Sequence, residues 1–187
     1  NAGARLRNVL VVALGQSRLL REPLAGLMHC FIFWGFVVLL TAILEALVQG
    51  FFREFSLEVL GLVFAPLAVL QETAGVLVII AVAVALARWY LVPPKRYFGA
   101  EVTGYIRLDA TLILLLILTI MISMFSANAT RMLVTGHWQS ARFVSAALAR
   151  HFQPGPGMRL WYEFSWWVHI LVVLGFLNYL PFSKHLH

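Results

Sequence analysis

Charged residues are scarce in this chain of 187 residues. Asp, Glu, Lys and Arg together make up 12% of it, whereas 61% is hydrophobic. A soluble domain usually contains about a quarter of charged residues, because polar side chains must cover its surface. With a mean hydropathy of +0.87, the composition excludes that class and indicates an integral membrane protein.

Cysteine is also nearly absent, since Cys30 is the single one. One thiol excludes an internal disulfide, and it excludes a cysteine-ligated iron–sulfur cluster or zinc site built within this chain alone. We therefore expect any [4Fe-4S] cluster that works with this chain to lie in a partner or in a downstream domain.

Long apolar runs are plentiful, at about residues 25–49, 67–92, 108–133 and 160–182. Each is long enough to cross roughly 30 Å of hydrocarbon, which takes about 20 helical residues. The sequence thus predicts an all-α membrane bundle with four transmembrane helices over residues 25–187. Residues 1–24 come before it, and basic and apolar residues alternate within them at near-helical spacing. They predict an amphipathic helix, at the membrane interface or on the cytoplasmic side.

The formal net charge of +6 is compatible with nucleic-acid binding, but basic loops that set the orientation of a membrane protein explain it better. We expect no nucleic-acid partner. Nine Lys and Arg residues fall on one side of the predicted spans and five on the other, which predicts a cytoplasmic C-terminus. The five, on the side predicted to be outside, are Arg53, Arg131, Arg142, Arg150 and Arg159.

Four histidines lie in or beside the predicted spans, and His29, His169 and His187 are the ligand candidates. His185 falls on another face than His187, and it could replace His187 if the helix end unwinds. His169 and His187 are eighteen residues apart, which is about five helical turns, so both lie on one face of the last span. The first span runs antiparallel to the last, which places His29 and His187 at a similar depth near the inner surface. Two facing imidazoles can provide both axial ligands of a haem iron. The alternative for each histidine alone is a ring in the headgroup region. The shared depth favours a functional role, since an ionisable residue inside a membrane is a functional candidate.

The same residues carry a resemblance to a known family. The segments GLMHCFIFWGF (26–36) and HILVVLGFLNYLPFSKHLH (169–187) resemble the gamma subunit of respiratory nitrate reductase. The first of these segments is still more similar to the cytochrome b membrane domain of iron–sulfur oxidoreductases related to heterodisulfide reductase. The resemblance covers about residues 5–187 and is strongest in the first and last spans. It implies a fifth span upstream of Asn1 and a cluster-bearing domain after His187.

The resemblance also implies a set of haem ligands. In the family pattern, His29 and His187 hold the haem b nearer the cytoplasm, and His169 holds a second haem nearer the outside. The chain departs from this pattern at Leu39, which stands where the partner of His169 is expected. Three explanations are then open: the second haem is absent, another residue ligates it, or His169 belongs to a quinone pocket.

The resemblance implies a function as well. It predicts a respiratory-chain membrane domain that passes electrons between menaquinone or ubiquinone and a cytoplasmic iron–sulfur, heterodisulfide reductase-like domain or subunit, or an electron-transferring flavoprotein. The expected location is the inner membrane of a bacterial or archaeal cell. The alternatives are a cofactor-free anchor for a redox complex and a small transporter. No pair of broken half-helices, the usual mark of a transporter site, stands out.

A few charged residues fall within or at the ends of the predicted spans, where burial of charge is costly. Glu45 and Glu72 either relay protons for a quinone or sit at the outer interface. Arg88 and Asp109 are candidates to pair with each other or to meet haem propionates. Arg131 is a candidate for an outer propionate.

Overall fold

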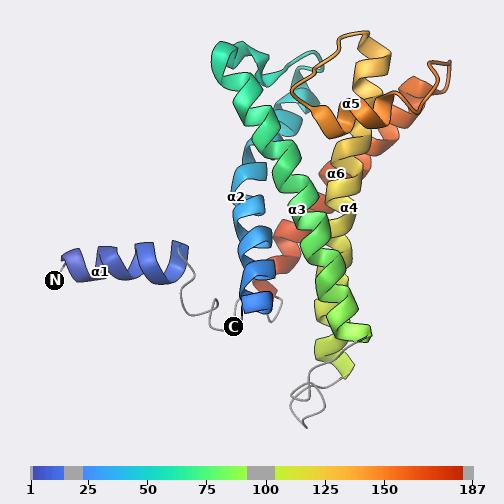
Figure 1. The fold of residues 1–187 in the computed structure, drawn as a ribbon. Helices are drawn as coiled ribbons and strands as arrows, with labels where there is room; N and C mark the ends of the chain where they lie inside the picture. Colours follow the sequence, from blue (N-terminus) through green and yellow to red (C-terminus); the bar gives the residue numbers. More distant parts are fainter. Residues whose placement is uncertain (1, 15–22, 92–103, 183–187) are drawn as a thin grey trace.

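The computed structural model describes residues 2–14, 23–91 and 104–182, and every regular element in these ranges is a helix. Four helices are long and apolar enough to cross a membrane, as predicted. They form the bundle seen in Figure 1. These helices are α2 (Pro23–Phe51), α3 (Phe64–Tyr90), α4 (Gly104–Thr135) and α6 (Met158–Tyr179).

The shorter elements join or flank the bundle. A short α1 (Ala2–Asn8) continues into one turn of π-helix, Val9–Leu14, and Figure 1 shows α1 to the side of the bundle. Within it Arg5, Leu6 and Arg7 are all exposed. The described part of the predicted amphipathic segment, residues 2–14, is helical, while its position at a membrane stays a prediction. The other short helices are η3 (Leu57–Val63), α5 (Phe143–Ala149) and η5 (Leu180–Phe182).

Two of the glycines allow the helices to approach closely. A Cβ atom on Gly35 of α2 would collide with the side chain of Val78 on α3. One on Gly75 of α3 would lie 2.7 Å from the ring of Phe125 on α4. Small residues at such crossings bring backbones together, which is how membrane helices gain packing contacts without a hydrophobic driving force.

Apolar side chains fill the inside of the bundle and also cover its outside. The buried cluster includes Leu39, Ile43, Val78, Val82, Ile113, Met121, Met124, Phe125, Val173 and Phe176. On the outside, Leu44 and Leu171 are each 60% exposed and Ile122 is 56% exposed. Contact with lipid accounts for these exposed chains, since hydrocarbon tails solvate leucine as well as another helix does.

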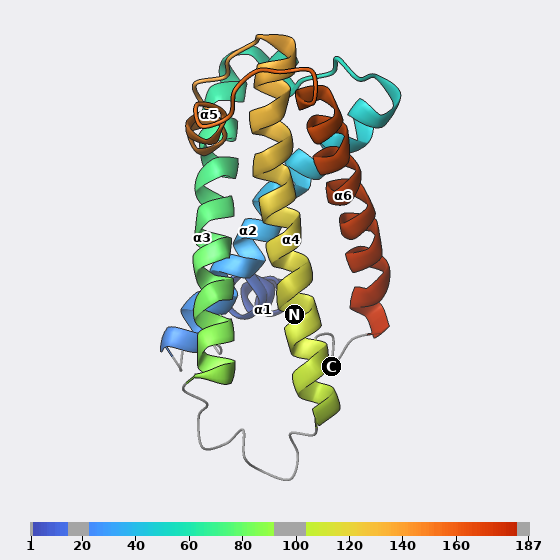
Figure 2. The ribbon, with the colours of Figure 1, turned by 90° about the vertical axis from the view of Figure 1, so that its right-hand side faces the viewer.

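One end of the bundle carries most of the polar structure. We call it the α5 end: α2 and α4 end there, and α3 and α6 begin there. Figure 2 shows α3, α4 and α6 side by side, with α2 crossing behind them and α5 lying against α3 and α4. Trp161 and Trp167, each about half exposed, lie on α6 near this end, and tryptophans are typical of the interface between a membrane and water.

Candidate functional site

An apolar cavity of about 240 Å³ lies between the four long helices. It is lined by side chains from α2, α3, α4 and α6, mostly Phe, Leu, Ile, Val and Met. His29 and His169 are the two histidines on its wall. The fold thus brings together two of the three predicted ligand positions, from helices far apart in the sequence. The third, His187, lies outside the described residues.

His169 is buried in the middle of α6, with 4% of its surface exposed. Its Nδ1 lies 3.1 Å from the backbone oxygen of Ile120 and 3.2 Å from Oγ of Ser123. Because a carbonyl oxygen only accepts hydrogen bonds, Nδ1 carries the proton and donates. The other nitrogen, Nε2, then keeps its lone pair, and none of the described residues donates a hydrogen bond to it. Metal-ligating histidines are commonly fixed in this way.

His29 sits two turns into α2, at the end of the bundle away from α5, and is more exposed than His169. The two histidines therefore approach the same cavity from opposite ends. A haem needs an apolar slot and axial ligands, and the lining around His29 fits both needs provided that a second imidazole comes from the end of the chain.

The surroundings of His169 fit a second haem less well. Leu39 is 4% exposed and lines the same cavity, and its side chain has no lone pair to give. Apart from the two histidines, the side chains on the described wall that could ligate an iron are the thioethers of Met121 and Met124. In the part of the chain that the structure describes, His, Cys, Asp and Glu do not gather into any group of three that could hold a metal ion.

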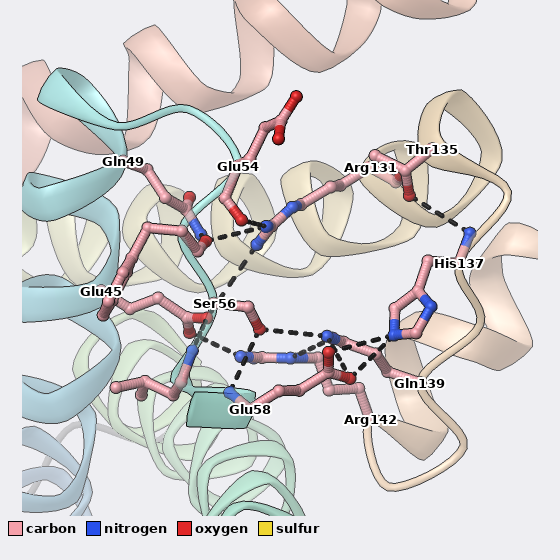
Figure 3. Close-up of polar contacts among 12 residues, drawn as sticks. Glu45, Gln49, Glu54, Ser56, Glu58, Arg131, Thr135, His137, Gln139 and Arg142 are labelled. Carbon is pink, nitrogen blue, oxygen red and sulfur yellow. Dashed lines mark hydrogen bonds and ion pairs between the residues drawn. The ribbon is translucent and has the colours of Figure 1, made fainter. Parts of the chain in front are cut away.

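A buried ion pair organises the α5 end. Arg142, just before α5, donates to Glu45 on α2 with Nη2 and Oε2 2.6 Å apart. Both side chains are almost fully buried, at 3% and 5% exposure. Arg142 also donates to Gln71 at 3.3 Å and to Gln139 at 2.9 Å. Figure 3 shows this polar cluster, with Arg131 approaching Glu45 from α4.

Further contacts complete the neutralisation of Glu45. The backbone N–H of Leu57 donates to Oε1 of Glu45 at 2.9 Å, and Nη1 of Arg131 lies 3.9 Å from the same oxygen. Nη2 of Arg131 donates to the carbonyl of Phe55 at 2.8 Å. A buried carboxylate needs both counter-charge and hydrogen bonds, and Glu45 has both. It is therefore held inside the protein, near the α5 end of the bundle.

Glu72 is fully buried and binds the first turn of α5. Its two oxygens accept hydrogen bonds from the backbone N–H of Ser145 at 2.8 Å and from the hydroxyl of Ser145 at 2.7 Å. This carboxylate also lies inside the protein. Both glutamates of the predicted spans attach the loop between α4 and α6 to the bundle.

The remaining predicted partners are placed differently. Asp109 accepts a hydrogen bond from the hydroxyl of Tyr179, and no ion pair joins it to Arg88, although both residues are described. His137 lies on the exposed surface, where its Nε2 is 2.9 Å from Oε1 of Glu58. The sequence reasoning missed the role of Arg142, which it counted only as a charge in an outer loop.

Comparison with known proteins gives two similar chains. One is the "Probable iron-sulfur-binding oxidoreductase FadF" of Bacillus subtilis (strain 168), 29% identical over 98% of this chain and 25% of its own length. The other is the "EtfAB:quinone oxidoreductase" of Syntrophomonas wolfei, 26% identical over 98% of this chain and 26% of its own length. The chain thus spans about a quarter of the length of these curated relatives. No family model and no solved structure matches it.

These similarities support a relationship with iron–sulfur oxidoreductases, as the sequence analysis predicted. They extend over nearly the whole chain, so the four-helix bundle is the part that is shared.

Proposed function

We propose that this chain is the membrane domain of a quinone-linked iron–sulfur oxidoreductase and binds haem b. In this proposal His29 and His187 are the axial ligands of the haem nearer the cytoplasm, and the C-terminus is cytoplasmic. The observation that carries the proposal is one apolar cavity with histidines from two helices on its wall. The names of both relatives agree with it, since one is called iron–sulfur-binding and the other a quinone oxidoreductase.

When bound, the haem would supply one-electron redox chemistry within the membrane. The chain's own residues would hold and shield it. His29 would ligate from α2, while Phe36 and Phe176 on the cavity wall would exclude water from its surroundings. A dry, apolar setting of this kind is one of the ways in which a protein tunes the potential of a haem.

His169 takes one of two roles in this proposal. It ligates a second haem, with a partner other than Leu39, or its Nε2 accepts a hydrogen bond from a quinol hydroxyl. The free Nε2 lone pair fits either role, and haem counting separates them.

The test is the dithionite-reduced minus oxidised spectrum of the purified full-length protein, with haem quantified as pyridine haemochrome. The variants are His29→Ala, His187→Ala and His169→Ala, and His151→Ala in the exposed loop is the matched control. We expect b haem to be lost with His29 or His187 and retained in the control. Retention in His169→Ala would assign His169 a role other than ligation. Absence of haem from a well-folded native preparation would refute the cytochrome assignment.

A cofactor-free anchor is the competing function. The buried Glu45–Arg142 pair and the tightly packed glycines would serve a purely structural bundle equally well. This alternative predicts no Soret absorbance, and it predicts that a partner subunit still assembles on the His29→Ala variant.

A further inference from the structure

Three cavities follow one another from the α5 end into the bundle. The first is about 510 Å³ and lies among the loops at the α5 end. The second, of about 30 Å³, shares Asn128, Arg131 and Tyr162 with the first. It also shares His169 and Met124 with the apolar cavity described above. Cavities with a common wall residue are neighbours, so these three form a series that passes His169.

The small middle cavity is polar and has the size of a water molecule. A water needs about 10–15 Å³ of accessible volume and two to four polar partners to occupy a site. Glu45, Gln49, Asn128, Arg131 and Arg142 all line this cavity. It therefore has both the room and the partners that a bound water requires.

A second observation points to a ligand in the same place. The indole Nε1 of Trp166 is buried and meets no acceptor among the described residues, and Trp166 lines the middle cavity. A buried N–H without a partner is rare in folded proteins, and a water that bridges it to other groups is the usual explanation. The Nε2 lone pair of His169, on the same wall, is a second unused site for a hydrogen bond.

The fixed charges of this cavity keep it polar. Glu45 and Arg142 form a direct ion pair, and Arg131 lies beside them, so the group carries charges of both signs within a few ångströms. Buried charges without water or protein partners cost several kcal/mol. A passage lined by charged groups therefore stays hydrated. The apolar cavity between the four long helices does not favour water.

We propose that these cavities form a narrow water passage which carries protons between the α5 end and a redox ligand beside His169. The passage rests on the geometry of the described residues, and its purpose rests on the proposed function. Reduction of a quinone consumes two electrons and two protons and gives the quinol. The electrons would come one at a time from the iron–sulfur or flavoprotein partner, and the protons would arrive through water in the middle cavity. Oxidation of a quinol would release both protons the same way.

The narrowness of the passage sets what it conducts. About 30 Å³ holds one or two waters, because one water needs about 10–15 Å³ of accessible volume. A quinone is too large to pass. The quinone would reach the apolar cavity from the lipid, and the α5 end would exchange only protons and water.

The direct test is chemical access to the middle cavity. Ala46 and Ala127 line it and are each 9% exposed. Ala74 is 8% exposed and lines none of the three cavities, so it is the matched control. Each alanine is replaced by cysteine in the full-length protein in sealed vesicles of known orientation. Ag⁺ in chloride-free buffer is the probe, since it is about as small as a water. Native Cys30 is retained as a reference near the other end of α2.

Protection of each thiol from later alkylation in denaturant is measured by mass spectrometry. We expect Ag⁺ added on the α5 side to protect Ala46→Cys and Ala127→Cys at least about tenfold faster than Ala74→Cys. A tenfold ratio of rates corresponds to an activation barrier for the reaction with Ag⁺ that is lower by ~1.4 kcal/mol. Equal rates at the three positions would overturn the passage. So would faster protection of the two cavity positions from the opposite side.

A second measurement tests whether the passage carries protons. Ala46→Val fills the middle cavity and Ala74→Val is the control of equal volume change. With a soluble quinone analogue and a reductant, we expect proton uptake on the α5 side, reported by a pH dye, to slow several-fold in Ala46→Val only. The haem spectrum should be unchanged in both. Equal uptake in the two variants would refute a proton path here. Absence of haem or of quinone reduction from the native protein would instead refute the proposed function, and the Ag⁺ result would stand independently.

Discussion

The buried pair between Glu45 and Arg142 offers the sharpest test of how the α5 end is held together. Replacing Arg142 by methionine keeps much of its length and removes its charge and its donors. Glu45 would then be a buried carboxylate that has lost a hydrogen bond of 2.6 Å. Removal of one partner from a buried pair typically costs about 3–5 kcal/mol, because the other charge stays uncompensated.

Two features of the structure set where in that range the cost should fall. Arg131 stays 3.9 Å from Glu45, and the N–H of Leu57 still donates to it, so compensation is partial. Against this, Gln71 also loses a donor. We expect Arg142→Met to cost about 3 kcal/mol, near the lower end for a buried pair. For a chain of this size that corresponds to a fall in Tm of roughly 6–12 °C.

The matched control is a second arginine–glutamate pair in the same molecule. Arg53 pairs with Glu163 on the surface, where the two side chains are 58% and 25% exposed. Exposed pairs are screened by solvent and contribute about 0–1 kcal/mol, so Arg53→Met should shift Tm little. The assay is thermal unfolding of the purified protein in one detergent at one scan rate, since unfolding of membrane proteins is often irreversible.

The double variant Glu45→Leu/Arg142→Met completes the cycle. It removes both charges together, and such replacements are often neutral or stabilising. Its Tm should therefore recover much of the loss seen in Arg142→Met. If Arg142→Met costs no more than Arg53→Met, the buried pair does not hold the loop to the bundle and the reasoning is wrong.

Three further predictions concern other parts of the bundle. Gly35→Leu should separate α2 from α3 and cost at least about 1–3 kcal/mol, because the side chain has no room, whereas Gly175→Leu at an open position should not. Leu39→His should add an imidazole as a partner for His169 in the cavity that both positions line, and raise the haem content measured as pyridine haemochrome, provided that haem b binds as proposed. Glu72→Ala should remove the acceptor at the start of α5 and speed tryptic cleavage of the loop between α4 and α6.

Each of these predictions has an outcome that would contradict it. Equal thermal stability of the two glycine variants would show that the α2–α3 crossing adapts easily. An unchanged haem content in a folded Leu39→His variant would mean that position 39 does not face a haem site. An unchanged cleavage rate in Glu72→Ala would mean that other contacts hold α5 in place.

The long helices were predictable because each is fixed by local composition. A run of apolar residues about the thickness of a bilayer must satisfy its backbone hydrogen bonds internally, and a helix does so without any partner. The described boundaries extend the predicted spans by a few residues at some ends, for example to Pro23 and Thr135. Helix ends depend on the loops that follow, and loops were not predictable from local apolar content.

The site was predictable only in part. The antiparallel run of the first and last spans predicts that His29 and His187 lie at a similar depth, and His187 lies outside the described residues. The structure shows His29 and His169 on the wall of one cavity. Glu45 and Glu72 were recognised as unusual because charge is costly in a span. Their partners were not recognised, because Arg142 and Ser145 belong to a loop whose path the sequence pattern does not reveal.

The sequence by itself determined the class of the protein, the number of its long helices in this chain, and the few polar residues that those helices carry. Local hydrophobicity suffices for this, because the bilayer acts on each segment separately. The tertiary structure decided which polar residues meet. Glu45 and Arg142 are 97 positions apart, and His169 has its proton placed by a carbonyl 49 positions away. Such pairings follow from helix packing and loop closure, and no local pattern contains them.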